Sequence, residues 1–163
     1  MTGQTSSLGN SSGMASGTNG LVSITYRGEE NLWGNIWKWI DEINVYNYNV
    51  GNLFVSNYNF TDNSNTSPYE DAGFTFAGTN GYISAFGYNT SFDWLFYPSE
   101  TLGSSTNPIG DYFAQTKSAS NYTVPKLGGA WYFGTLAGTF CNYSDDVSTA
   151  RGKAIGARLV YIP

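Results

Sequence analysis

The sequence predicts a single α+β domain with one main N-terminal helix, short antiparallel strands and long loops. The chain has 163 residues, a length that fits one hydrophobic core. Aromatic residues make up 17% and charged residues 12%, and there are 20 glycines, a composition typical of strands, turns and loops. One segment, residues 29–41, carries a helical spacing of apolar residues, whereas residues 43–59 alternate with a period of two.

Residues 1–20 are mostly Ser, Gly, Thr and Asn, with few apolar side chains. Such a segment buries too little surface to offset the entropy of ordering it, so we expect a flexible or extended arm. It either serves as a linker or becomes ordered against another subunit. The folded domain is expected to span residues 21–163 and to begin with a strand at residues 21–26.

The predicted helix lies between Glu29 and Asp41, with two acidic residues at the end where the helix dipole favours them. Its apolar positions recur at steps of three and four residues, and they are Leu32, Trp33, Ile36, Trp37 and Ile40. We expect this face to be buried in the core. Gly34 inside the helix costs about 1 kcal/mol relative to alanine, which indicates a close neighbour at that position.

The alternating segment 43–59 predicts a hairpin, with a turn at Gly51 and Asn52. Further short strands are expected near residues 74–76, 82–86, 111–113 and 122–124, and residues 99–110 form a loop rich in Gly, Ser and Pro. The chain should therefore contain many short strands after the helix.

The last part of the chain has two ends that are expected to be rigid. Gly128 and Gly129 permit backbone angles or close approaches that a Cβ would prevent, and Trp131 is large enough to anchor a core. Residues 154–161 read as a terminal strand. The residues between them, 132–153, show neither a helical nor a strand period and are rich in aromatic, hydroxyl and amide groups. They form either a binding loop or a long loop packed on its own core.

Composition excludes several kinds of chemistry. The net charge is −5 and only seven residues are Lys or Arg, so we expect no nucleic-acid partner. Histidine is absent and Cys141 is the sole cysteine, which excludes intrachain disulfides, thiolate metal clusters and Ser-His or Cys-His catalysis. No apolar run reaches 18 residues and no signal peptide is recognisable, so we expect no membrane insertion.

Three blocks of the sequence resemble a known family. Residues 33–39, Trp-Gly-Asn-Ile-Trp-Lys-Trp, resemble the GNVWEW element of the formylglycine-generating-enzyme branch of the C-type lectin fold. Residues 128–131, Gly-Gly-Ala-Trp, and 155–158, Ile-Gly-Ala-Arg, resemble the GG[SA]W and G[FA]R elements that close that fold. The C-terminal block is most similar to the variable proteins of diversity-generating retroelements, phage receptor-binding proteins of the major tropism determinant type. The resemblance covers residues 21–163.

This resemblance implies a C-type lectin-like scaffold that displays variable side chains to a host-surface protein or glycan. The displayed residues would be Tyr132, Phe133, Thr135, Leu136, Thr139, Cys141, Asn142, Tyr143, Ser144 and Asp145. Scaffold positions within the same stretch would be Gly134, Ala137, Gly138, Phe140 and Arg151. The resemblance also implies a homotrimer on the surface of a phage virion, in contact with other virion proteins, or alternatively a location on a bacterial cell surface.

The departures from the family exclude its other activities. Formylglycine-generating enzymes work through paired cysteines, and this chain has only Cys141, so we expect no such oxidase chemistry. The calcium-site motifs of sugar-binding lectins are absent, so we expect no metal and no cofactor. No acid pair is recognisable as a glycosidase site, and we expect no catalysis. A structural capsid or tail decoration protein is the alternative function, and a carbohydrate-active enzyme ranks last. Arg158 is expected to form an ion pair with Asp41 or Glu42.

Overall fold

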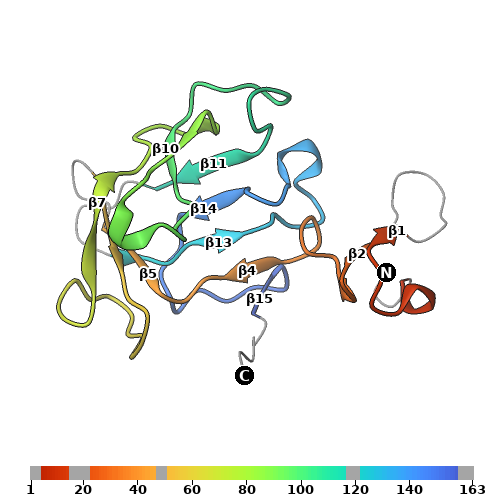
Figure 1. Cartoon of the computed structure of the whole chain (residues 1–163), viewed down its shortest axis with the longest axis horizontal. Coiled ribbons are helices and arrows are strands. Elements are labelled where there is room, and N and C mark those ends of the chain that lie inside the picture. The colour runs from red at the N-terminus through yellow and green to blue at the C-terminus, as the bar shows by residue number, and fades with distance from the viewer. Residues whose placement is uncertain (1–4, 15–22, 47–50, 117–121, 158–163) are drawn as a thin grey trace.

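A computed structural model describes residues 5–14, 23–46, 51–116 and 122–157. These residues form a β-rich protein with four sheets (Figure 1). Its helical elements are three 3-10 turns: η1 (Ser6–Leu8), η2 (Thr90–Phe92) and η3 (Gly134–Leu136). Within the described residues there is no helix of seven residues or more, so the predicted class, an α+β C-type lectin-like fold with a main N-terminal helix, is wrong.

The largest sheet has six strands in the order β15-β4-β13-β14-β11-β8. The strands are β4 (Trp37–Trp39), β8 (Gly81–Tyr82), β11 (Tyr112–Gln115), β13 (Lys126–Leu127), β14 (Asn142–Ser144) and β15 (Ile155–Gly156). It is a mixed sheet, because β15 is parallel to β4 and β14 is parallel to β11, whereas β13 is antiparallel to both of its neighbours. Non-consecutive strands therefore meet at its centre.

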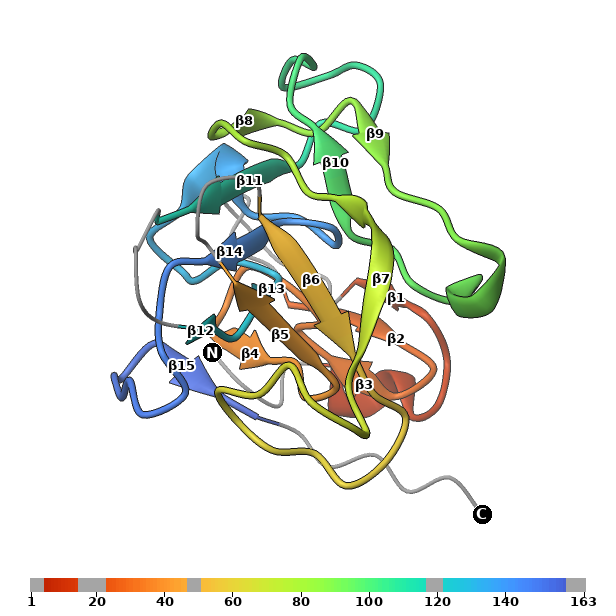
Figure 2. The same ribbon diagram turned by 90° about the vertical axis from the view of Figure 1, so that its left-hand side faces the viewer.

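A four-stranded antiparallel sheet in the order β12-β5-β6-β7 lies at one end of the six-stranded sheet (Figures 1 and 2). Its strands are β5 (Ile43–Tyr46), β6 (Asn52–Val55), β7 (Glu70–Thr75) and β12 (Tyr122–Thr123). β5 and β6 pair from Ile43 opposite Val55 to Tyr46 opposite Asn52, which confirms the predicted hairpin. The turn expected at Gly51 and Asn52 is misplaced at Asn52, which is the first residue of β6. A separate pair joins β9 (Ala85–Phe86) to β10 (Pro98–Glu100).

A three-stranded sheet lies at the opposite end of the molecule from the four-stranded sheet (Figure 1). It consists of β1 (Gly13–Met14), β2 (Ile24–Tyr26) and β3 (Glu29–Glu30), with β2 in the centre. The Glu30 carboxylate accepts a hydrogen bond from the Thr5 backbone N at 2.8 Å and another from the Thr5 hydroxyl. Residues 5–14 of the expected arm are thus packed on β2 and β3.

The segment predicted to be a helix forms β3 and β4 instead. Asn31 and Gly34 adopt positive φ angles of 57° and 73°, a conformation that ends a right-handed helix. After them Trp37, Lys38 and Trp39 alternate across β4, and Trp37 is only 2% exposed. The tryptophans of this segment fit both a helical and a strand spacing, and the predicted helical one is wrong. The predicted burial of Trp37 is confirmed.

The main core lies between the four-stranded sheet and the segments around β8 to β11. Its buried residues include Val45, Leu53, Ile83, Tyr97 and Phe113. A second, smaller cluster gathers Trp37, Ala130, Cys141 and Ala154, and Phe133 and Tyr143 pack against it. This smaller cluster connects the centre of the six-stranded sheet to the segment predicted to bind a ligand.

The expected terminal strand is described only in part. Ile155 and Gly156 pair in parallel with Trp37 and Lys38. Ala154 and Ala157 are described and do not belong to β15. Residues 158–161 lie outside the described residues, and so does the expected ion pair of Arg158.

Candidate functional site

The candidate site is segment 131–140, which connects β13 to β14 at the end of the six-stranded sheet nearest the three-stranded sheet (Figure 1). The predicted irregular stretch 132–153 is wrong in one respect, because it contains the short turn η3 and the strand β14. Only the part before β14 is a loop that leaves the sheet. The predicted residues in this loop can contact a binding partner, whereas those in β14 are part of the sheet.

Two glycines hold the start of the segment close to its neighbours. Gly128 and Gly129 have positive φ angles of 91° and 77°. A Cβ on Gly129 would lie 2.7 Å from the Ala137 Cβ and 2.9 Å from its Cα, and one on Gly128 would lie 3.2 Å from the Leu32 carbonyl oxygen. The sequence prediction of positive φ and close approach at this pair is therefore confirmed.

Asp111 holds the other end of the segment. One of its carboxylate oxygens accepts a hydrogen bond from the Phe140 backbone N at 2.5 Å. Gly138 packs so tightly against this carboxyl group that a Cβ there would lie 1.9 Å from an Asp111 oxygen. The scaffold role predicted for Gly138 thus has a physical basis. Between these two anchored ends the segment closes on itself through η3, with Ala137 N donating to the Gly134 carbonyl.

Large aromatic side chains of this anchored segment face solvent. Trp131 is 50% exposed, Tyr132 62% and Phe140 42%. The rings of Trp131 and Tyr132 meet edge to face at 5.1 Å, and the Lys153 ammonium lies 5.8 Å from the Trp131 ring centroid. Thr135 and Thr139 are also exposed. We call these five residues, Trp131, Tyr132, Thr135, Thr139 and Phe140, the exposed aromatic surface.

A cluster of rings in edge-to-face and tilted contacts, of which only Trp37 is fully buried, supports this surface. Tyr132 contacts Phe133 at 5.0 Å between centroids, and Phe133 contacts Trp37 at 4.9 Å and Tyr143 at 5.1 Å. Trp37 and Tyr143 are themselves 4.7 Å apart. Burial raises the pKa of Tyr143, with smaller contributions from Cys141, Tyr112 and Asp145, so its hydroxyl stays protonated. Phe133 and Tyr143, both predicted to be displayed, serve mainly to hold the segment in place.

Three of the ten predicted ligand-binding residues are buried, and their predicted display is wrong. Cys141, Asn142 and Ser144 are at most 1% exposed. Asn142 and Ser144 belong to β14, which lies between β13 and β11, and the Ser144 hydroxyl bonds with the Tyr97 hydroxyl. A strand in the middle of a sheet has neighbours on both edges. These side chains contribute to folding and have no access to a partner.

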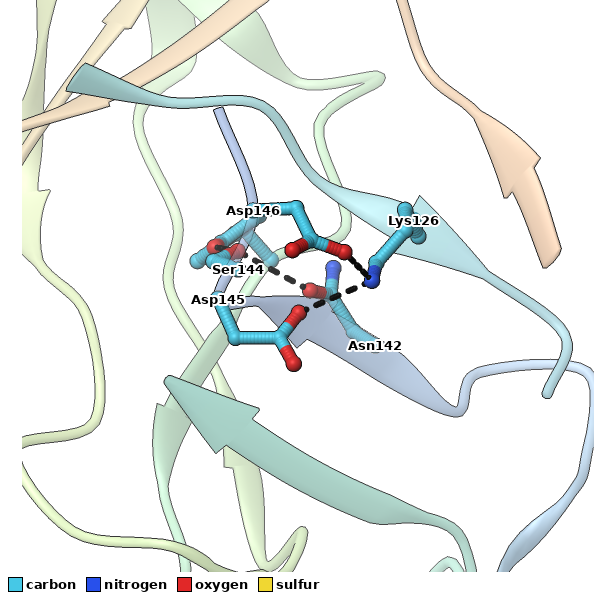
Figure 3. A network of polar contacts seen from close by, with 6 residues as sticks. Lys126, Asn142, Ser144, Asp145 and Asp146 are labelled. Carbon is cyan, nitrogen blue, oxygen red and sulfur yellow. Dashed lines mark hydrogen bonds and ion pairs between the residues drawn. The ribbon is translucent and has the colours of Figure 1, made fainter. Parts of the chain in front are cut away.

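Asp145, another predicted ligand contact, takes part in an ion-pair network (Figure 3). Lys126 is buried in β13, and its ammonium lies 3.0 Å from an Asp145 oxygen and in contact with Asp146. The same ammonium lies 5.4 Å from the Trp37 ring centroid and 5.8 Å from that of Trp39. A buried ammonium requires such partners, so the carboxylate of Asp145 is engaged within the protein. Leu136, the remaining predicted residue, is half-buried in η3.

Sequence reasoning placed two residues of the exposed aromatic surface elsewhere. Trp131 was expected to anchor the core and Phe140 to be scaffold, whereas both are exposed. For Trp131 the sequence signal is the pair of glycines that precedes Ala130, whereas the positive φ angles of that pair and the burial of Ala130 are seen only in the structure. The sequence contains no signal for the exposure of Phe140, because that exposure depends on the hydrogen bond between its backbone N and Asp111.

Burial makes the thiol of Cys141 unreactive, which gives a testable prediction. Burial, followed by the nearby Asp111 charge, raises its pKa to about 12. Alkylation requires the thiolate, so at pH 8.5 iodoacetamide should label the folded protein at least about 100-fold more slowly than the urea-unfolded protein. Mass spectrometry of timed samples measures this ratio, and equal rates would contradict the burial.

The same shift predicts a loss of stability at alkaline pH. The folded thiol keeps its proton up to a pH of about 12, whereas the unfolded thiol has its ordinary pKa of 9.0. Stability is therefore fully present below pH 9 and is lost as the pH rises from 9 to 12, by about 1 kcal/mol at pH 10. Urea unfolding at pH 8 and pH 10 should show a smaller pH effect in Cys141→Ala than in the natural protein.

Gly129→Ala tests the close approach at the start of the segment. The alanine would combine a strained positive φ with contact against the backbone of Ala137, so we expect a loss of about 2–4 kcal/mol in stability. Gly78→Ala is the matched control, because Gly78 has open space around its Cβ position and no positive φ. Thermal unfolding of both variants is the measurement, and equal midpoints would contradict the assignment.

Among the described residues, no group of three or more Cys, Asp or Glu side chains is arranged to hold a metal ion. In the same part of the chain, no helix has the length and apolar character needed to cross a membrane. Comparison with protein families, with curated proteins and with solved structures finds no match to this chain.

Proposed function

We propose that this protein is an adhesin domain of a phage fibre, which attaches to a host-surface protein or glycan through the exposed aromatic surface. The observation that carries the proposal is the exposure of Trp131, Tyr132 and Phe140 on one segment anchored at both ends. Trp131 and Tyr132 are exposed in contact with each other at 5.1 Å, an arrangement typical of interaction sites, and Phe140 lies at the other end of the segment against Phe86 at 5.4 Å.

The chemistry of this surface suits binding. Tyr and Trp offer large contact areas and lose little conformational entropy when bound, while hydroxyl groups such as those of Thr135 and Thr139 adapt their hydrogen bonds to a partner. Because Gly129 and Asp111 already hold the backbone, little ordering cost remains to be met on binding. We propose recognition without catalysis.

The sequence resemblance of residues 128–131 and 155–158 to the ends of retroelement variable proteins supports the same function. In that reading the variable side chains are the exposed residues of segment 131–140, and the buried members of β14 are excluded from the set. A homotrimer on the virion surface is part of this proposal. The alternative, a decoration protein, would pack the same surface on a neighbouring virion subunit.

The test is binding of the fluorescently labelled domain to a panel of bacterial strains, measured by flow cytometry. Saturable staining of at least one strain, displaced by excess unlabelled domain, is the expected result. Treating the cells with proteinase K or with periodate then distinguishes a protein receptor from a glycan. Absence of displaceable staining on every strain, together with incorporation of the domain into purified virions, would favour the decoration protein.

A further inference from the structure

An apolar pocket lies between the three-stranded sheet and the segment that follows it. Its volume is about 630 Å³, within the range of about 300–1,000 Å³ typical of small-molecule sites. The lining residues are Gly13, Met14, Ile24, Thr25, Tyr26, Leu32, Trp33 and Thr139. Met14, Tyr26 and Thr139 are exposed, so the pocket is open to solvent.

A buried hydroxyl in this lining has no hydrogen-bond partner. Thr25 is 6% exposed, and its Oγ1 makes no hydrogen bond within the described residues. The residue is in the central strand β2, where it pairs with Gly13 on one side and with Glu30 on the other. Leaving a buried hydroxyl unpaired is costly. Because Oγ1 is shielded from solvent, a bound group reaches it once the Thr25 side chain rotates toward the pocket, and a hydrogen bond made there would remove that cost.

The absence of charged residues from the lining limits the kinds of ligand that the pocket can bind. None of the eight lining residues is charged, and the chain carries a net charge of −5. A carboxylate or phosphate in contact with this lining would lose its hydration without gaining a cation, and an ammonium would gain no anion. The Arg27 guanidinium lies 5.3 Å from the centroid of the Tyr26 ring and is not part of the lining. The pocket therefore suits an uncharged molecule with an apolar body and one hydroxyl or carbonyl group.

We propose that this pocket binds a neutral amphipathic small molecule, whose apolar part lies against Met14, Ile24 and Trp33 and whose polar group hydrogen-bonds with Thr25. This site goes beyond the proposed function, because host attachment uses the exposed aromatic surface and requires no ligand in the pocket. Thr139 belongs to both, which places the pocket directly beside the attachment surface.

The test uses the purified full chain and 1-decanol as the probe, with isothermal titration calorimetry as the readout. We expect saturable binding with one site per chain, and at least tenfold weaker binding of decanoate, which has the same length and a negative charge. Thr25→Val keeps the shape of the side chain and removes the hydroxyl, so it should weaken decanol binding about fivefold to tenfold.

Two matched variants locate the site. Thr139→Trp fills the rim of the pocket and should abolish decanol binding, whereas Thr135→Trp adds the same ring at another exposed threonine of the segment and should leave binding unchanged. Circular dichroism of both variants establishes that they are folded. Since the assay contains no cells, its failure is distinguishable from a failure of the attachment function.

Two results would overturn the proposal: the absence of saturable binding by the natural chain, and binding that survives Thr139→Trp. If the natural chain binds no decanol and also self-associates in sedimentation velocity, and Thr139→Trp dissociates it, the pocket is a contact between copies of the chain. Unchanged decanol affinity in Thr25→Val would overturn the role of the hydroxyl.

Discussion

Replacing Trp131 and Tyr132 together with serine is expected to reduce binding to host cells at least about 100-fold. Each residue is half-exposed or more, and truncation of such aromatic contacts at the centre of an interface costs about 2 kcal/mol or more each. The midpoint of thermal unfolding should change by only a few degrees, because neither ring is part of a buried cluster. Flow cytometry and calorimetry on the same sample measure both quantities.

The matched control for this variant is Tyr88→Ser combined with Leu102→Ser. These side chains are 70% and 86% exposed and lie outside segment 131–140, so their loss removes a similar apolar area without touching the proposed surface. Host binding should be retained. If the control loses binding and the Trp131 and Tyr132 variant keeps it, attachment uses another face of the protein.

Trp37→Ala is expected to be the most destabilising single change, with a loss of about 3–5 kcal/mol. The side chain is 2% exposed and contacts the rings of Phe133 and Tyr143, and the Lys126 ammonium lies over it. For a chain of this size, the melting midpoint should fall by about 10 °C. Host binding should fall as well, because Phe133 would lose the support that positions Tyr132.

Trp94→Ala is the control for tryptophan truncation. Trp94 is 40% exposed and contacts mainly the Phe92 ring, so its removal should cost about 1 kcal/mol or less. Urea unfolding followed by circular dichroism gives both free energies. A loss for Trp37→Ala no larger than that for Trp94→Ala would show that the small cluster does not support the segment.

Local chemistry explains the features that could be predicted from the chain. The hairpin of β5 and β6 was predicted from an alternating pattern, and it forms between segments close together in the chain although burial alternates along neither strand. The glycine pair at 128–129 was expected to need backbone freedom, and positive φ angles occur there. In contrast, residues 31–39 satisfy both a helical and a strand period, and pairing of β4 with β13 and β15 decided between them.

Several features of the candidate site could not be predicted from local sequence patterns. Asn142 and Ser144 have the residue types of a recognition loop, yet β14 pairs with β11 some 30 residues earlier in the chain, at Phe113 opposite Asn142. Nothing near residue 142 in the sequence indicates that distant partner. The exposure of Phe140 depends in the same way on Asp111, which lies on the approach to β11.

The amino-acid sequence alone gives the residue types available for chemistry, which include no histidine, one cysteine and few charges, and it indicates the close approach at the glycine pair. It predicts a binding segment after Trp131. Which side chains of segment 131–140 face solvent, and the unpaired hydroxyl of Thr25 beside a pocket, are visible only in the folded chain. The physical reason is that composition and spacing act locally, whereas exposure is set by pairing between segments far apart in the chain.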